Sequence, residues 1–388
     1  MLRSGAVDQD FGLSEEQREV VAAVRAFGQE QVAPATTGLE ERGEFPHELF
    51  AALGEMGLAG VPYDERYGGA GLDWLTYMAV LEELAKASLP LAVTVSVHHL
   101  SAFGIHRFGS EDLKERYLPR MLSGEWLGAY ALSEASSGSD AASLRTRAEP
   151  VQDGGWRLTG TKRFITHAGD AHVYLVMARS GGEGPRGISA FVVEKGWPGF
   201  GFGKLEAKMG LASSPMRELL FDGCAVPAGN VVGEEGQGFT VALAALEGGR
   251  LGIAACSVGL AQAALDAAVA FASSREQFGK PIAEFEGIQF MLADMATQIE
   301  AARRLYREAA RLVDAGGDAA RATSMAKLFA SDVAMRVTTD AVQVHGGYGY
   351  MREYPVERYL REAKALQIVE GTNQVQRMLI GRDLTGRD

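Results

Sequence analysis

One carboxylate near the C-terminal end of the chain has the setting of a general base. Glu370 follows the apolar residues Ile368 and Val369 and precedes Gly371 and Thr372. Burial disfavours a charged carboxylate and raises its pKa from about 4.3 towards neutrality, where a general base is effective. Gly371 has no side chain, so a bulky substrate can approach the backbone beside it. The alternative is an ordinary helix start, with Thr372 as N-cap and Glu370 solvated.

Four further segments have compositions suited to a polar ligand. Residues 130–140 (YALSEASSGSD) form a loop rich in hydroxyls after a strand-like run, and residues 162–166 (KRFIT) form a strand that ends in a hydroxyl. Residues 275–280 (REQFGK) supply an arginine, which pairs well with diphosphate oxygens, and residues 343–350 (QVHGGYGY) supply paired glycines. Each segment also has a plain structural alternative: capping hydroxyls, a strand end, a solvated charge and a helix stop.

In this order, and followed by Glu370, Gly371 and Thr372, these segments resemble the acyl-CoA dehydrogenase family over nearly the whole chain. The similarity is to members that act on short, branched or medium-length acyl chains. The resemblance implies FAD as cofactor, lying between a β-domain and a C-terminal bundle with its adenine end at a neighbouring subunit. It assigns cofactor binding to Tyr130, Leu132, Ser133, Ser139, Phe164, Ile165, Thr166, Arg275, Gln277, Phe278, Gln343, Gly346, Gly347, Thr372 and Gln374. It assigns acyl-CoA binding to Ser139, Glu247, Arg250, Gly371 and Arg382.

The resemblance also implies a reaction. Glu370 removes the α-proton of an acyl-CoA thioester while a hydride leaves the β-carbon for flavin N5, near Thr166, and the product is a trans-2-enoyl-CoA. The backbone N–H of Glu370 and a ribityl hydroxyl stabilise the enolate oxygen, as in an oxyanion hole. Some relatives carry the base at the position of Gly249, which has no side chain here, so the assignment stays with Glu370.

The family further implies electron-transfer flavoprotein as the electron acceptor, fatty-acid β-oxidation as the setting, and a homotetramer built from dimers. Three alternatives stay open: an acyl-CoA oxidase or a flavin monooxygenase on the same scaffold, and a helical scaffold without catalysis. The chain departs from the commonest pattern at three places. Ser133-Glu134-Ala135 replaces threonine-glutamate-proline, Phe164 replaces tryptophan, and Val369 replaces a frequent tyrosine. The last change widens the expected pocket and leaves the acyl chain length open.

Composition excludes several classes of protein. The net charge of -12 over 388 residues, with no lysine or arginine run, argues against a nucleic-acid partner. Cys224 and Cys256 are too few for a disulfide scaffold and have no metal-ligand spacing, so we expect reduced core thiols and no metal. We see neither an apolar signal core nor a long uncharged apolar span, and we expect a cytoplasmic protein without membrane insertion.

Periodicity predicts an α+β multidomain fold: an N-terminal α-helical domain (1–126), a middle β-barrel or sandwich domain (127–239) and a C-terminal four-helix bundle (240–388). We predict a helix that starts at a Ser14–Gln17 capping box and that Pro34 closes. Further helices are predicted at 46–57, 73–86, after Ser110, at 240–274, 288–315 and 319–345, and after Thr372. Strands are predicted at 156–159, 173–177, 188–193 and 219–221. Residues 182–187 match a GxGxxG pattern but open no helix, which predicts a hairpin loop rather than a dinucleotide site.

Overall fold

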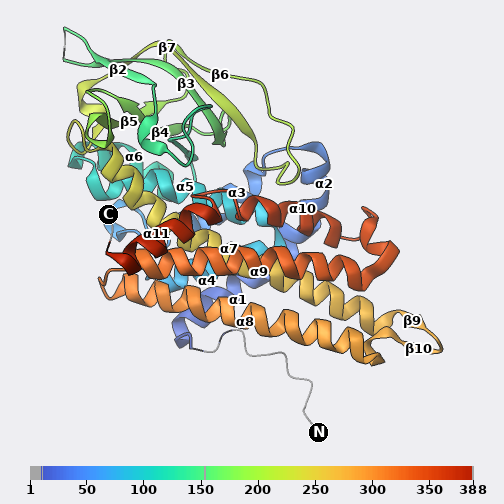
Figure 1. Ribbon diagram of the computed structural model, residues 1–388. Coiled ribbons are helices and arrows are strands. Elements are labelled where there is room, and N and C mark those ends of the chain that lie inside the picture. The colour runs from blue at the N-terminus through green and yellow to red at the C-terminus, as the bar shows by residue number, and fades with distance from the viewer. Residues whose placement is uncertain (1–9, 11, 153, 387–388) are drawn as a thin grey trace.

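The computed structural model describes Asp10, residues 12–152 and residues 154–386. Figure 1 shows a β-rich region that covers one side of a stack of long helices. The helix-to-strand change lies between Leu122 and Gly128, and helix returns at Gly238. The predicted limit at 126 falls in the first connection, whereas the predicted limit at 239 falls in the first turn of α7.

The first helical region contains α1 (Glu15–Phe27), α2 (Ala33–Arg42), α3 (His47–Glu55), α4 (Trp74–Ala87), α5 (Leu89–Phe108) and α6 (Glu111–Leu122). The capping box is confirmed, because Gln17 N donates to Ser14 Oγ at 3.2 Å and Ser14 N donates to Gln17 Oε1 at 2.9 Å. The prediction that Pro34 closes the helix is wrong. The chain continues through one π-helical turn, Gly28–Val32, and Pro34 lies in the first turn of α2. Ala33 N donates to Gly28 O across the π-helical turn, and this turn accommodates Pro34, which has no N–H to donate.

The middle region is one eight-stranded sheet. Its strands are β1 (Gly128–Ala131), β2 (Arg147–Pro150), β3 (Trp156–Thr166), β4 (Val173–Arg179), β5 (Ile188–Glu194), β6 (Phe200–Phe202), β7 (Met216–Val226) and β8 (Val231–Val232), in the order β6-β7-β3-β2-β4-β5-β8 with β1 beside β4. Along β4, the side chains of Tyr174 and Val176 pack in a core formed mainly by other strands. Those of Leu175 and Met177 pack in a second core, which the sheet shares with the helices. Both faces of β4 are therefore buried, which explains its continuous apolar sequence. Residues 182–187 connect β4 to β5 as an antiparallel hairpin, as predicted.

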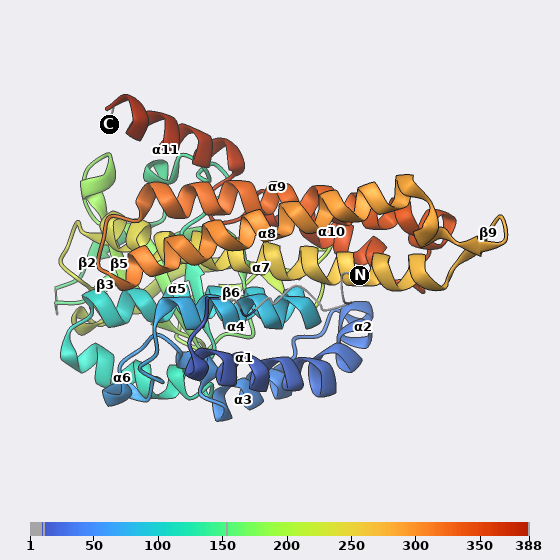
Figure 2. The ribbon, with the colours of Figure 1, turned by 90° about the horizontal axis from the view of Figure 1, so that it is seen from below.

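The last region contains α7 (Gly238–Ser274), the short strands β9 (Glu276–Gln277) and β10 (Lys280–Pro281), then α8 (Glu286–Asp314), α9 (Ala320–His345), α10 (Val356–Leu366) and α11 (Asn373–Thr385). Figure 2 shows α7, α8 and α9 running side by side, with α4 and α5 along one flank. The β9–β10 hairpin and α11 lie at opposite ends of this bundle (Figures 1 and 2).

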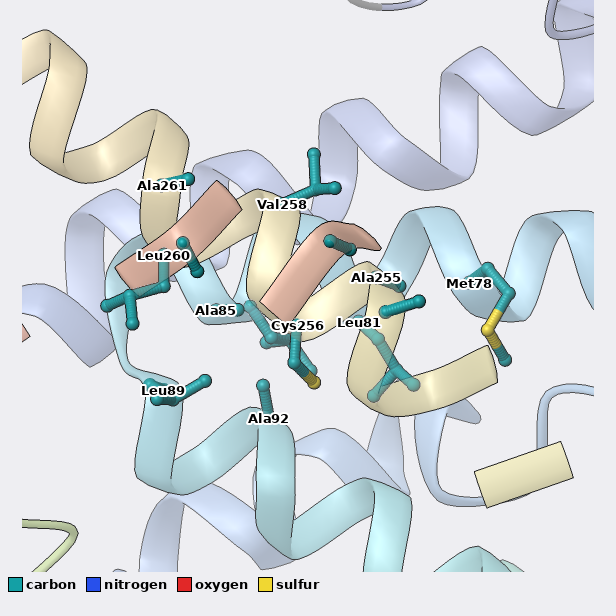
Figure 3. Packing of buried hydrophobic residues seen from close by; sticks show 14 of the residues in the cluster. Met78, Leu81, Ala85, Leu89, Ala92, Ala255, Cys256, Val258, Leu260 and Ala261 are labelled. Carbon is teal, nitrogen blue, oxygen red and sulfur yellow. The ribbon is translucent and has the colours of Figure 1, made fainter. Parts of the chain in front are cut away.

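Small side chains allow α4, α5 and α7 to approach closely. Figure 3 shows Ala255 and Cys256 of α7 facing Leu81 and Ala85 of α4. A Cβ at Gly259 of α7 would overlap the backbone oxygen of Glu82 and lie 2.8 Å from the Cβ of Ala85, so glycine is required at this crossing.

The expected lack of a long apolar span needs correction at α7. Within the described residues, α7 alone is long and apolar enough to cross a membrane by length and composition. Its most apolar window is 78% buried inside the protein, between α4, α5, α8 and α9, so it is the central core helix of this fold.

Candidate functional site

Glu370 lies in a tight bend between α10 and α11. Its φ is +54°, a left-handed conformation that is costly for a residue with a side chain, and Gly371 follows with φ +94°. Both carboxylate oxygens are buried and, among the described residues, have no hydrogen-bond partner. Burial raises the pKa of Glu370 to about 8, against the opposing charges of Lys327 and Arg250. The alternative of an ordinary helix start is therefore correct for Thr372, which caps α11, and wrong for Glu370, whose carboxylate is buried.

The carboxylate of Glu370 packs directly on Gly249 of α7. A Cβ built at Gly249 would lie 2.7 Å from Cδ of Glu370, and closer still to Oε2. It would also lie 2.7 Å from Cδ2 of Leu100 on α5. Glycine at position 249 thus makes the space that the carboxylate occupies.

Two polar side chains, those of Lys327 and Gln376, hold the bend, and neither was among the predicted site residues. Lys327 on α9 donates to Gly371 O at 2.9 Å and to Asn373 Oδ1 at 2.8 Å, and Gln376 Nε2 donates to Gly371 O at 3.0 Å. Burial lowers the pKa of Lys327 to about 8, while the carboxylate of Glu370 opposes that shift. The available signal was a lysine within the buried, alanine-rich stretch of α9.

Arg250 follows Gly249 and lies close enough to Glu370 for each charge to affect the pKa of the other group. It is half-buried, and its Nε has no hydrogen-bond partner within the described chain. Burial lowers the pKa of Arg250, and the carboxylates of Glu247 and Glu370 oppose this. Arg250 is therefore a half-buried cation near Glu370 rather than a solvated surface charge. Glu247 is half-buried, and its burial raises the pKa of its carboxyl group.

The hydroxyl-rich loop after β1 is fixed by a buried ion pair. Lys162 of β3 donates to Glu134 Oε1 at 2.9 Å and to Leu132 O at 3.0 Å. The backbone N–H groups of Arg145 and Thr146 donate to the two oxygens of Glu134 at 2.7 and 2.8 Å. Burial opposes ionisation of Glu134, but Lys162 and these donors hold its pKa below the usual range. Glu134 is therefore a structural anchor for the loop that carries Leu132 and Ser133.

The predicted ligand residues of this loop lie close to those of β3, because Arg163 N donates to Ser133 O at 2.9 Å. Tyr130 donates to Ala242 O of α7 at 3.2 Å, which ties β1 to the helix that carries Gly249. Phe164 has φ +60° at an irregularity in the β3–β7 pairing, and its ring is 56% exposed. Thr166 is half-buried two residues later. An exposed aromatic face beside hydroxyl groups suits a planar, polar ligand.

A second group of predicted residues lies at the other end of α7. Arg275, Gln277, Gly346 and Gly347 line a cavity of about 520 Å³ together with Phe271, Ile282, Val344, His345, Tyr348 and Met351. Nothing described lies within 4 Å of a Cβ built at either glycine, so the cavity wall is open backbone there. Phe278, with φ +54°, is 95% exposed on the turn between β9 and β10.

The structure thus separates the predicted residues into two groups. Gly249 and Arg275 are 26 positions apart on α7 and its C-cap, which corresponds to roughly 39 Å along the helix. The first group also contains Ile165, which is buried, and Gln374, which is exposed in the first turn of α11. Gln343 belongs to the second group and is exposed, as are Ser139 and Arg382 elsewhere on the chain.

The side chain of His345 is buried among the helices. Its Nδ1 lies 2.8 Å from Ala341 O, and its ring stacks on Phe271 at 4.3 Å. No group of three or more His, Cys, Asp or Glu side chains in the described part of the chain is arranged to hold a metal ion. Cys224 and Cys256 are free, buried thiols.

Comparison with known proteins gives consistent matches along the chain. The family models for acyl-CoA dehydrogenase match as N-terminal domain over residues 14–125, middle domain over 129–224 and C-terminal domain over 236–385. An acyl-CoA dehydrogenase of Bacillus subtilis is 48% identical over 96% of this chain and 99% of its own length.

Solved structures agree with the sequence matches. Butyryl-CoA dehydrogenase of Megasphaera elsdenii has a TM-score of 0.95 at 45% identity, covering 97% of this chain and all of that one. A chain in a study of the electron transferring flavoprotein of Acidaminococcus fermentans has a TM-score of 0.95 at 46% identity, over 97% and 99%. A glutaryl-CoA dehydrogenase of Mycobacterium smegmatis in complex with FADH2 has a TM-score of 0.93 at 31% identity, over 98% and 97%.

Proposed function

This chain belongs to the acyl-CoA dehydrogenase family, and we propose that it dehydrogenates a short or branched acyl-CoA thioester with Glu370 as the catalytic base. The observation that carries the assignment is the carboxylate of Glu370, which is buried, lacks a hydrogen-bond partner among the described residues and packs on Gly249. A desolvated carboxylate without competing donors is a stronger base than one in water.

The two groups of predicted residues fit FAD. Phe164, Thr166 and the anchored loop that carries Leu132 and Ser133 offer an aromatic face and hydroxyls for the flavin ring. The cavity with Arg275 and the glycine pair offers a cation and open backbone for a diphosphate. When bound, FAD supplies the acceptor for the hydride that leaves the β-carbon.

Glu370 then takes the α-proton onto a carboxylate oxygen. It must be ionised to do so, and the positive charges of Lys327 and Arg250 favour ionisation while burial opposes it. Lys327 and Gln376 fix the bend through its carbonyl oxygens. We assign the backbone N–H of Glu370 as a donor to the thioester oxygen, where negative charge develops.

The cofactor site needs two copies of the chain. Roughly 39 Å separates Gly249 from Arg275 along α7, farther than one extended FAD molecule reaches within a single chain. In this proposal Arg275, Gln277, Phe278 and the loop at Gly346 serve the flavin site of a neighbouring subunit, in a homotetramer built from dimers. Thr372 and Gln374 complete the site from the start of α11.

We further propose that electron-transfer flavoprotein is the electron acceptor and that the enzyme acts in cytoplasmic fatty-acid β-oxidation. The similarity to a chain from a study of electron transferring flavoprotein supports the choice of acceptor. An acyl-CoA oxidase or a flavin monooxygenase would instead pass its electrons rapidly to oxygen. A scaffold without catalysis would purify without colour.

Anaerobic titration of the purified protein with acyl-CoA thioesters of varied length and branching tests the proposal. A yellow protein whose flavin absorbance is bleached by a short or branched thioester is expected. Glu370→Gln should keep the colour and the thioester affinity but lose bleaching. Rapid bleaching of Glu370→Gln would show that another group is the base, and fast reoxidation in air would favour an oxidase.

A further inference from the structure

A buried histidine near Glu370 has a ring nitrogen with no described hydrogen-bond partner. His99 lies on α5 and is 2% exposed. The hydroxyl of Tyr63 donates to His99 O at 3.0 Å and also lies 2.9 Å from Nδ1 of His99. Since the single proton of that hydroxyl goes to His99 O, we assign the ring proton to Nδ1, which donates to Tyr63 and leaves a lone pair on Nε2. Across the described residues, nothing donates to this Nε2.

The ring of His99 is an acceptor at any physiological pH. Burial, with smaller contributions from His98 and His106, lowers the pKa of His99 to about 3, so the imidazole is neutral. A buried acceptor without a donor is destabilising, and such groups are uncommon in native proteins. The lone pair of Nε2 therefore needs a hydrogen-bond donor, and the reaction at Glu370 does not provide one.

His99 lies one side chain away from the carboxylate site. Its ring stacks on Tyr77 at 4.7 Å, and the charge of Glu370 is close enough to raise the pKa of Tyr77 further. Nε2 lies 3.7 Å from the Cβ position at Gly248, next to the glycine on which Glu370 packs. The rings of Trp74 and Phe103, at 5.0 and 5.9 Å from His99, flank it.

These contacts bound the distance between the base and the acceptor. Cβ positions of adjacent helical residues are roughly 5 Å apart, so Nε2 of His99 is at most about 12 Å from Cδ of Glu370. Reacting atoms meet at about 3–3.5 Å, and a hydrogen bond spans about 3 Å. At most roughly 5 Å then remains between the α-carbon and a donor, the length of three or four single bonds.

We propose that Nε2 of His99 accepts a hydrogen bond from a hydroxyl at the distal end of a short acyl chain, which selects ω-hydroxyacyl-CoA thioesters such as 4-hydroxybutyryl-CoA and 5-hydroxypentanoyl-CoA. The inference rests on the proposed function, since it needs the thioester beside Glu370. The aromatic side chains of Trp74 and Phe103 limit the length of the acyl chain, and His99 recognises the hydroxyl at the end of that chain. An apolar chain of equal length leaves the lone pair unpaired, and a site built to pair a hydroxyl discriminates strongly against such a chain.

Equilibrium binding separates recognition from turnover. In the FAD-loaded Glu370→Gln protein, calorimetry gives the Kd of 4-hydroxybutyryl-CoA against butyryl-CoA and of 5-hydroxypentanoyl-CoA against pentanoyl-CoA. We expect at least a tenfold preference for the hydroxylated member of one pair. Adding His99→Leu should abolish that preference. His99→Gln is the matched control and should keep part of it, because glutamine retains an acceptor oxygen near the position of Nε2.

The outcomes are distinguishable. Equal affinity within both pairs in the Glu370→Gln protein overturns the role of His99, as does a preference that His99→Leu leaves intact. Either result would indicate that Nε2 binds only water. If the wild-type protein fails to dehydrogenate every thioester of the panel, the proposed function is wrong. Turnover of butyryl-CoA without a hydroxyl preference leaves that function standing and rejects only this inference.

Discussion

Replacing Glu370 by glutamine should change the stability of the protein in a pH-dependent way. The pKa of Glu370 is raised by burial from 4.5 to about 8 in the folded protein. Below pH 4.5 the carboxyl is neutral in both the folded and the unfolded state, so the full stability is present. As the pH rises towards 8 the unfolded chain releases the proton and the folded protein keeps it, so stability is lost.

The pKa shift sets the size of the effect. A rise from 4.5 to about 8 corresponds to roughly 5 kcal/mol, complete above pH 8. Glutamine does not ionise, but its introduction also removes an attractive partner of Lys327. We therefore expect Glu370→Gln to be more stable than wild type by about 3 kcal/mol at pH 9 and by less than about 1 kcal/mol at pH 5. For a chain of this length, the gain at pH 9 corresponds to a Tm increase of roughly 3–6 °C.

Thermal unfolding of both proteins from pH 5 to pH 9 is the assay, with excess FAD, one protein concentration and one scan rate. Glu235→Gln, at an exposed glutamate, is the matched control and should show no pH-dependent difference from wild type. A Tm difference between Glu370→Gln and wild type that is constant across this range would refute the argument. So would a glutamine variant that is less stable at pH 9, because the carboxylate would then be well solvated or paired.

Three other predictions follow from contacts in the site. Gly249→Ala should lower kcat/KM at least ~100-fold and keep the yellow colour, because the new Cβ displaces the carboxylate of Glu370. The control Gly381→Ala, on the open surface of α11, should leave turnover unchanged. Unchanged turnover in Gly249→Ala would contradict the prediction. The kcat/KM of wild type should rise about tenfold per pH unit up to about pH 8 and then level, because only ionised Glu370 accepts the proton; a flat profile from pH 6 to 8 would argue against this base. Lys162→Met should lower the free energy of unfolding by about 3–5 kcal/mol and weaken FAD affinity, because Glu134 keeps a buried charge without its cation. Lys162→Met combined with Glu134→Gln should recover part of the lost stability in thermal unfolding. Equal losses of stability in both variants would show that the ion pair does not anchor the loop.

Secondary structure was predictable where caps, turn residues or a long apolar run mark the limits of an element. Helices α1, α4 and α6 begin at Ser14, Asp73 and Ser110, each of which caps the helix with its side chain as the sequence indicates. Helix α5 was not predicted from the sequence as a separate element. It is buried on nearly all sides, so its sequence has no apolar stripe with a helical period. Helix α10 was also missed, although Glu357 and Arg361 pair four positions apart on it.

Left-handed backbone occurs at three of the residues that the sequence predicted as site residues from their type and order. Five described non-glycine residues have positive φ, and three of them are Phe164, Phe278 and Glu370. Such conformations cost of order 1–3 kcal/mol each and persist where the surrounding structure requires them. Residue type alone cannot reveal this, because the conformation follows from contacts such as those of Lys327 and Gln376 with the Glu370 bend.

The sequence by itself determined which chemical groups are present and in what order: a carboxylate before a glycine, hydroxyls after a strand, an arginine and a glycine pair between helices. It also determined most helices and strands, because capping and periodicity are local properties. Only the tertiary structure decided that Gly249 makes room for Glu370, that Lys327 holds the bend, and that Glu134 anchors a loop rather than acting on substrate. These contacts join residues 28 to 121 positions apart, so they depend on how the helices and the sheet pack rather than on any local pattern.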